Sequence, residues 1–89
     1  MRLYKEVLQK YLRESISEYR EKKGYSQEKM AEKLHESTRS YIEQEHGRYG
    51  FSAWTLLFYL LMLTDKEVEI FLGEFRKRVE KEEKREEVA

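Results

Sequence analysis

The chain of 89 residues contains no cysteine and no proline, and only four glycines. Without cysteine, neither a disulfide nor a thiolate metal site can staple the fold. Without proline and with little glycine, few residues interrupt a helix. These absences favour an all-helical protein.

The chain also lacks an excess of charge of one sign, since 18 lysines and arginines balance 18 aspartates and glutamates. Proteins that bind nucleic acid usually carry a basic excess, so the total charge does not argue for DNA. It does not exclude DNA either, because a local patch can bind it. Charged residues make up 40% of the chain, against roughly 25% in an average soluble domain, which indicates a highly solvated surface.

No apolar run is long enough to cross a membrane. The longest, from Trp54 to Leu63, is broken only by Thr55, and a membrane span needs about 20 residues. The first residues, MRLYKEVLQKYLRE, carry a charge every few positions and no apolar stretch with a cleavage site, so we expect no signal peptide. These features predict a cytoplasmic protein.

Apolar residues recur at steps of three and four along most of the chain, which is the period of an amphipathic helix. We expect one domain of five helices, over residues 3–23, 27–34, 38–45, 53–63 and from 64 or 65 onward, with a charged helical tail at 76–89. Serines suited to capping precede the middle three helices, at Ser26, Ser37 and Ser52. The helix over 53–63 is apolar nearly all round, which predicts burial on most of its sides.

The segments LRESISEYREKKGYSQEKMAEKL and STRSYIEQEHGR resemble the lambda-repressor-like helix-turn-helix family of phage repressors, Cro proteins and related bacterial regulators. The matching positions keep the family's spacing without a gap: Arg20, Gly24, Ser26, Gln27, Met30, Ala31, Glu45, Gly47 and Arg48. The resemblance covers residues 12–72, since FSAWTLLFYLLML also looks like the family's fourth helix. It implies an all-α, five-helix lambda-repressor-like DNA-binding domain, here with an extended N-terminal helix and a long charged C-terminal helix.

The helix-turn-helix itself falls at residues 27–45, and the spacing of its residues agrees with such a motif. Ala31 supplies the small residue needed where two steeply crossing helices touch. Met30 and Leu34 share one helix face and can pack under Tyr41. The second helix of such a pair has its N-terminal end free to enter a major groove.

The resemblance also implies roles for single residues. Thr38, Arg39 and Glu43 occupy the positions that usually read bases, and Arg20 and Glu45 are expected to form an internal ion pair. Gln27, Ser37, Ser40 and Arg48 are expected to contact phosphates or base edges beside the reading positions. Tyr49, in the loop after the recognition helix, is a further candidate for a DNA contact. The full DNA-binding set is Gln27, Ser37, Thr38, Arg39, Ser40, Glu43, Arg48 and Tyr49.

Several positions depart from the family pattern. His35 stands where glycine is common and is expected at a strained positive φ. Glu36 and Gln44 stand where the family usually buries apolar residues, and Ile42 where it shows a polar one. Glu43 can accept a hydrogen bond from cytosine but repels phosphates. Residues 26–50 carry four basic and five acidic side chains, a weak footprint for a DNA-binding surface.

Three functions remain open. The first is sequence-specific, non-catalytic DNA binding by a small transcriptional regulator, a repressor of the kind carried by phages and mobile elements, acting as a homodimer on a palindromic operator. The second is a protein-binding module, such as an antitoxin or an inhibitor of a host defence nuclease, which the neutral charge, Glu43 and Ile42 favour. The third is an assembly subunit that dimerises through its apolar helices and does not touch DNA.

We expect no enzymatic activity, cofactor or metal site. No nucleophile or glycine-rich loop accompanies the carboxylates, so no catalytic constellation is recognisable. His35 and His46 have no third ligand at a suitable spacing other than glutamates.

Overall fold

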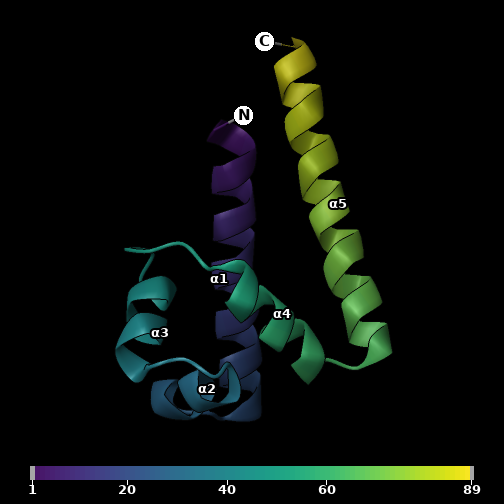
Figure 1. Cartoon of the computed structure of the whole chain (residues 1–89). Coiled ribbons are helices and arrows are strands. Elements are labelled where there is room, and N and C mark those ends of the chain that lie inside the picture. The colour runs from purple at the N-terminus through teal and green to yellow at the C-terminus, as the bar shows by residue number, and fades with distance from the viewer. Residues whose placement is uncertain (1, 89) are drawn as a thin grey trace.

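The computed structural model describes residues 2–88, and the side chains of residues 4–85. Within that range the chain is all-α, without a strand, and has five helices (Figure 1): α1 Arg2–Lys23, α2 Gln27–Lys33, α3 Thr38–Glu45, α4 Ala53–Met62 and α5 Asp65–Val88. The prediction of an all-α chain with five helices is confirmed, and the observed bounds lie within one residue of the expected ones. None of these helices combines the length and the apolar composition needed to cross a bilayer.

Short-range hydrogen bonds set the starts of four helices. Three serines have extended backbone and accept the N–H three residues on: Ser26 from Lys29 at 3.0 Å, Ser37 from Ser40 at 3.1 Å and Ser52 from Thr55 at 3.3 Å. At α5 the capping is reciprocal, since Thr64 Oγ1 accepts the Glu67 N–H at 3.1 Å and the Glu67 carboxylate accepts the Thr64 N–H at 2.9 Å. The helix starts therefore depend on residues that are neighbours in sequence.

Left-handed backbone occurs at three turns. Gly24 (φ 71°) follows α1 and Gly47 (φ 80°) follows α3, where a residue without Cβ meets no steric penalty. His35, in the turn between α2 and α3, has φ 56°, which confirms the positive φ expected there. Its ring lies against Phe58 of α4, with centroids 4.6 Å apart, although the residue as a whole remains exposed.

The long helix α1 is the element on which the others pack (Figure 1). The short helices α2 and α3 lie on one side of it, and α5 runs back along the other side in the opposite direction. Tyr11 of α1 stacks on Phe71 and Phe75 of α5, with centroids 5.2 and 5.4 Å apart. These ring contacts join α1 to α5.

The core gathers side chains from every helix around α1. Met30 of α2, Leu34 directly after α2 and Tyr41 of α3 are all fully buried, so the expected packing of these three residues in one core is observed. The complete buried apolar set is Tyr11, Leu12, Ile16, Met30, Ala31, Leu34, Tyr41, Phe51, Tyr59 and Phe71.

Helix α4 is much less buried than its composition predicted, and the prediction of burial on most sides is wrong for the single chain. Only Thr55 and Tyr59 are buried on it, while Trp54, Leu57 and Leu61 are 57%, 61% and 77% exposed. These three side chains are spaced three and four residues apart and therefore share one face, which we call the α4 stripe. The reason for the error is that the rest of the chain covers only the opposite face of α4.

Candidate functional site

Helices α2 and α3 form a compact unit around a tight turn. The Leu34 N–H is shared between the carbonyls of Met30 (3.0 Å) and Ala31 (3.1 Å), and the Glu36 N–H also reaches the Ala31 carbonyl at 3.0 Å. Ala31 is buried where the helices meet, as its small side chain suggested. In Figure 1, α3 lies on the outside of the molecule, on the side of α1 opposite to α5.

A polar network holds the C-terminal end of α3. The Glu45 carboxylate accepts hydrogen bonds from Arg20 Nε at 2.8 Å and Nη2 at 3.2 Å, from Gln27 Nε2 at 2.8 Å and from the Tyr41 hydroxyl. Arg20 Nη1 also donates to the carbonyl of Tyr25 at 3.0 Å. The ion pair that the family resemblance implied is present, and it joins α1, α2 and α3 through one carboxylate.

The electrostatics of this network keep each member in one protonation state at neutral pH. Burial raises the pKa of Glu45, but the hydrogen bonds from Arg20, Tyr41 and Gln27 outweigh it and leave that pKa below its usual value. The pKa of Arg20 is raised, chiefly by its hydrogen bond to Glu45. Burial and the Glu45 carboxylate raise the pKa of Tyr41. A charged Glu45–Arg20 pair with a neutral tyrosine is therefore stable across the physiological range.

Gln27, to which the resemblance assigns a DNA contact, is also a member of this network. One hydrogen of its side-chain amide is donated to Glu45, and the side chain is half-buried. The second amide hydrogen remains for a phosphate, which accepts but does not donate. The contact expected from the resemblance is thus compatible with the geometry, but Gln27 also joins α2 to α3.

The N-terminal turn of α3 presents polar side chains to solvent. Ser37 and Ser40 are exposed, with the Ser37 hydroxyl donating to Ser40 Oγ at 3.0 Å, and Thr38 is half-buried. Arg39 is exposed and makes no hydrogen bond or ion pair with any of the side chains described for residues 4–85. This turn therefore offers one guanidinium whose donors are all available to a ligand.

The remaining predicted contacts lie at the other end of α3. Glu43 accepts a hydrogen bond from Arg48 Nη1 at 2.9 Å, so the acidic reading position is paired with the expected phosphate contact. Tyr49 is exposed in the loop that follows. The pairing reduces the repulsion that Glu43 alone would exert on a phosphate, and it also holds Arg48 beside α3.

The two polar residues that depart from the family pattern form a buried cluster with α4. Thr55 Oγ1 donates to Glu36 Oε2 at 2.8 Å. Gln44, with its amide nitrogen turned toward Glu36, reaches the two carboxylate oxygens at 2.5 and 3.2 Å. Burial raises the pKa of Glu36, which the hydrogen bonds from Thr55 and Gln44 only partly offset. The pairing of Glu36 with Thr55, which interrupts the apolar run from Trp54 to Leu63, was not predicted from the sequence.

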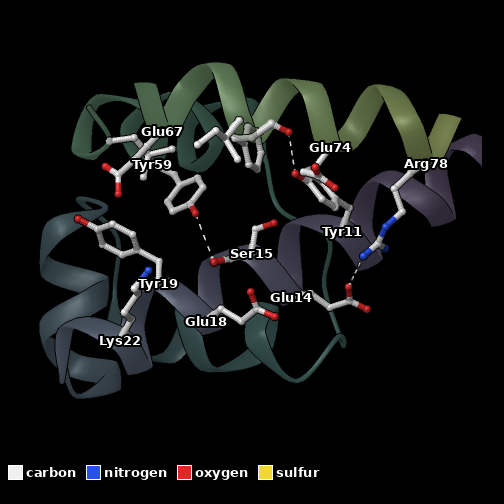
Figure 2. A pocket seen from close by; sticks show the side chains of 13 residues that line it. Tyr11, Glu14, Ser15, Glu18, Tyr19, Lys22, Tyr59, Glu67, Glu74 and Arg78 are labelled. Atoms are coloured by element: carbon white, nitrogen blue, oxygen red, sulfur yellow. Dashed lines mark hydrogen bonds and ion pairs between the residues drawn. The ribbon is translucent and has the colours of Figure 1, made fainter. Parts of the chain in front are cut away.

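A groove of about 430 Å³ opens between α1 and α5 (Figure 2). Its charged and tyrosine lining comprises Tyr11, Tyr19, Tyr59, Glu14, Glu18, Glu67, Glu74, Lys22 and Arg78. The hydroxyls of Tyr11 and Tyr59 donate to the carbonyls of Phe71 (2.6 Å) and Ser15 (3.3 Å), and burial raises the pKa of both. Because these hydroxyls are used internally, the groove is better explained as a packing seam than as a reactive site.

The histidines do not meet other ligating groups. His35 faces Phe58, and His46 is an exposed residue at the end of α3. Among the described residues, no three histidine, aspartate or glutamate side chains come together in a way that would hold a metal ion.

Comparing the chain with models of protein families, with known proteins and with solved structures finds no match. The likeness to helix-turn-helix regulators therefore rests on the residues quoted above.

Proposed function

We propose that the chain is a sequence-specific, non-catalytic DNA-binding transcriptional regulator, acting as a homodimer on a palindromic operator in the manner of a phage or mobile-element repressor. The observation that carries this proposal is the exposed N-terminal turn of α3, where Arg39 has no partner among the described residues. That turn belongs to a helix whose other end is fixed by the Glu45 network. A rigid helix with an unpaired guanidinium at its exposed end is suited to reading bases.

In the proposed mechanism α3 enters the major groove by its N-terminal turn. Arg39 would donate two hydrogen bonds to the O6 and N7 acceptors of a guanine, and Thr38 would contact the neighbouring base through its methyl or hydroxyl group. Ser37 and Ser40 would contact the adjacent backbone. Because phosphate contacts position a protein and base contacts select the site, the discrimination would come mainly from Arg39.

The α4 stripe supports the homodimer in this proposal. Trp54, Leu57 and Leu61 expose a row of large apolar side chains on one helix face. A contiguous exposed apolar surface on a small domain is typical of an interface. To bind a palindromic site, the twofold dimer would have to present its two copies of α3 about one helical turn of DNA apart.

The test is selection from random duplex DNA at low and moderate salt. We expect the native protein to enrich a palindrome and a Thr38→Ala, Arg39→Ala double variant to lose it, since each bidentate base contact discriminates by about 1–3 kcal/mol, or roughly 5- to 150-fold. Arg76→Ala, which removes an exposed arginine on α5, is the matched control and should enrich the same site. Equal enrichment by the native and double-variant proteins would refute a reading role for α3.

A second candidate is a protein-binding module on the same fold. The observation that favours it is a row of two exposed glutamates on α2, since Glu28 and Glu32 lie four residues apart and so share one helix face, beside the exposed Lys29 and Lys33. Such a face would meet a basic, nucleic-acid-binding surface of another protein. The same selection separates the two candidates, because a native protein that enriches no duplex even at low salt would favour the protein partner.

A further inference from the structure

A recess of about 450 Å³ lies between the N-terminal half of α1 and the loop that follows α3. Figure 1 shows this loop reaching α1 from the side on which α3 lies, with α1 continuing beyond it. The lining residues are Lys5, Glu6, Gln9, Arg13, Gly47, Tyr49 and Gly50. Only Tyr49 among them belongs to the DNA-binding set expected from the sequence, and the four lining residues of α1 do not.

The loop is held against α1 by a two-way hydrogen bond. Gln9 Oε1 accepts the Phe51 N–H at 2.6 Å, and Gln9 Nε2 donates to the Phe51 carbonyl at 3.2 Å. Phe51 itself is buried in the core. A Cβ at Gly50 would lie 3.1 Å from the Gln9 amide, so a larger residue there would push the Gln9 side chain away from Phe51 by a few tenths of an ångström. The shape of the recess is therefore built into the fold.

The charge on the α1 side of the recess is mainly positive. Lys5, Gln9 and Arg13 are four residues apart and so share one face of α1. Arg13 is half-buried, and its guanidinium lies over Gly47, where a Cβ would be 3.4 Å from Arg13 Cζ and Nε. Within the part of the chain that the structure describes, Arg13 has neither a hydrogen-bond acceptor nor a counter-ion. The single carboxylate in the lining is that of Glu6.

A half-buried guanidinium that has no acceptor within the protein can donate its hydrogen bonds to a bound anion, and such charge-assisted hydrogen bonds are strong. A phosphodiester offers oxygens that only accept hydrogen bonds, and Lys5 and Arg13 only donate them. These two residues are eight positions apart, or about 12 Å along the helix axis, so they would follow a length of backbone and not a single point. The exposed Tyr49 lies at the same recess and can add a hydroxyl donor.

We propose that this recess is a second anchoring point, in which Lys5 and Arg13 of α1 bind phosphates of the DNA backbone beside the site read by α3. The inference rests on the proposed function, because the anion is a phosphate of the same duplex. Lys5 and Arg13 would thereby compensate for the lack of a basic excess in residues 26–50, which carry four basic and five acidic side chains. They would raise affinity without changing which sequence is chosen, since backbone contacts carry no direct sequence information.

The experiment compares native protein with a Lys5→Gln, Arg13→Gln double variant on the selected operator and on a scrambled duplex, over a range of salt concentrations. The variant should lose affinity for both duplexes by the same factor, and the slope of log Kd against log salt should fall by about two, since each phosphate contact contributes about 0.9. Lys10→Gln, an exposed lysine on another face of α1, is the matched control and should leave the slope unchanged. Arg13→Lys retains the charge and should keep most of the slope.

Circular dichroism would establish that the variants are folded. If the double variant keeps native affinity and slope while Arg39→Ala loses the operator, the second anchoring point is refuted and the proposed function stands. If the native protein binds no duplex, both fail together. In that case, chemical-shift changes at Arg13, Gly47 and Gly50 on titration with inorganic phosphate would identify a small phosphate as the ligand in place of DNA.

Discussion

Replacing Glu45 with alanine is expected to lower the free energy of unfolding by about 3 kcal/mol. Glu45 and Arg20 have side chains only 10% and 19% exposed, and Glu45 also accepts from Gln27 and from the fully buried Tyr41 hydroxyl. The substitution leaves that hydroxyl without an acceptor, at about 1–3 kcal/mol. It also leaves Arg20 with the Tyr25 carbonyl as its remaining hydrogen-bond acceptor among the described residues. Breaking a buried pair costs about 3–5 kcal/mol, and the residual exposure of Arg20 puts the total at the low end of that range.

Urea denaturation followed by circular dichroism at pH 7 measures this loss. A domain of this size is expected to melt roughly 12–24 °C lower after a change of about 3 kcal/mol. Glu32→Ala is the matched control, because Glu32 is an exposed glutamate whose 3.5 Å pair with Lys29 lies at the surface. It should change the free energy of unfolding by less than about 0.5 kcal/mol.

The pH dependence gives an independent check of the same reasoning. The pKa of Glu45 is lower in the folded chain than its ordinary value of 4.5. Its ionised form therefore contributes stability that is fully present above that value and is lost as the pH falls through the folded pKa. The advantage of the native chain over Glu45→Gln should shrink under acid. A loss below about 1 kcal/mol for Glu45→Ala with an unchanged m-value would refute the argument. So would a difference in the free energy of unfolding between the native chain and Glu45→Gln that does not change with pH.

Leu61→Glu on the α4 stripe is expected to change the stability of the monomer by less than about 0.5 kcal/mol but to abolish the proposed homodimer; unchanged sedimentation of the variant would contradict that interface. Glu36→Gln should stabilise the fold at pH 7, because burial raises the pKa of Glu36 and so disfavours its ionised form. This gain should vanish below pH 4.5, the ordinary value, where the carboxyl is neutral in both states, and denaturation at two pH values tests it. Gly47→Ala should cost about 1–2 kcal/mol because its φ is positive, whereas Gly73→Ala, where a Cβ meets nothing in the middle of α5, should gain up to about 1 kcal/mol in thermal denaturation.

The helix bounds were predictable because the groups that set them lie within a few residues of one another. Ser26, Ser37 and Ser52 each accept an N–H three residues on, and that spacing is visible in the sequence. The same holds for Gly47, which must take a left-handed conformation after α3. Short-range geometry of this kind does not depend on how the helices pack.

The candidate site was predictable only in part. Arg20 and Glu45 were paired through the family resemblance, and their contact spans 25 positions. The role of Gln27 as a partner of Glu45 was not foreseen, because nothing in the sequence says that the α2 and α3 ends converge on one carboxylate. The recess at Gln9 was also missed, since its hydrogen bonds reach 42 positions to Phe51.

Helix α4 is the clearest case in which composition misled. Ten residues of almost unbroken apolar character suggested burial on most sides, yet Trp54, Leu57 and Leu61 are open to solvent. A helix face is buried only when a second surface packs against it, and the sequence of the helix does not specify that second surface. Periodicity can identify an apolar face, but it cannot say whether another part of the chain, a second copy or water lies against it.

The residue pattern alone therefore decides where this chain becomes helical, since capping, left-handed turns and periodicity act over three or four residues. Tertiary packing decides which faces are covered and which charges find partners. Glu36 shows the difference. Its carboxylate stands where the family resemblance implies a buried apolar residue, and it is accommodated because Thr55 of α4, 19 positions away, donates a hydrogen bond to it. A buried polar group needs a partner in space, and the distance along the chain does not limit where that partner comes from.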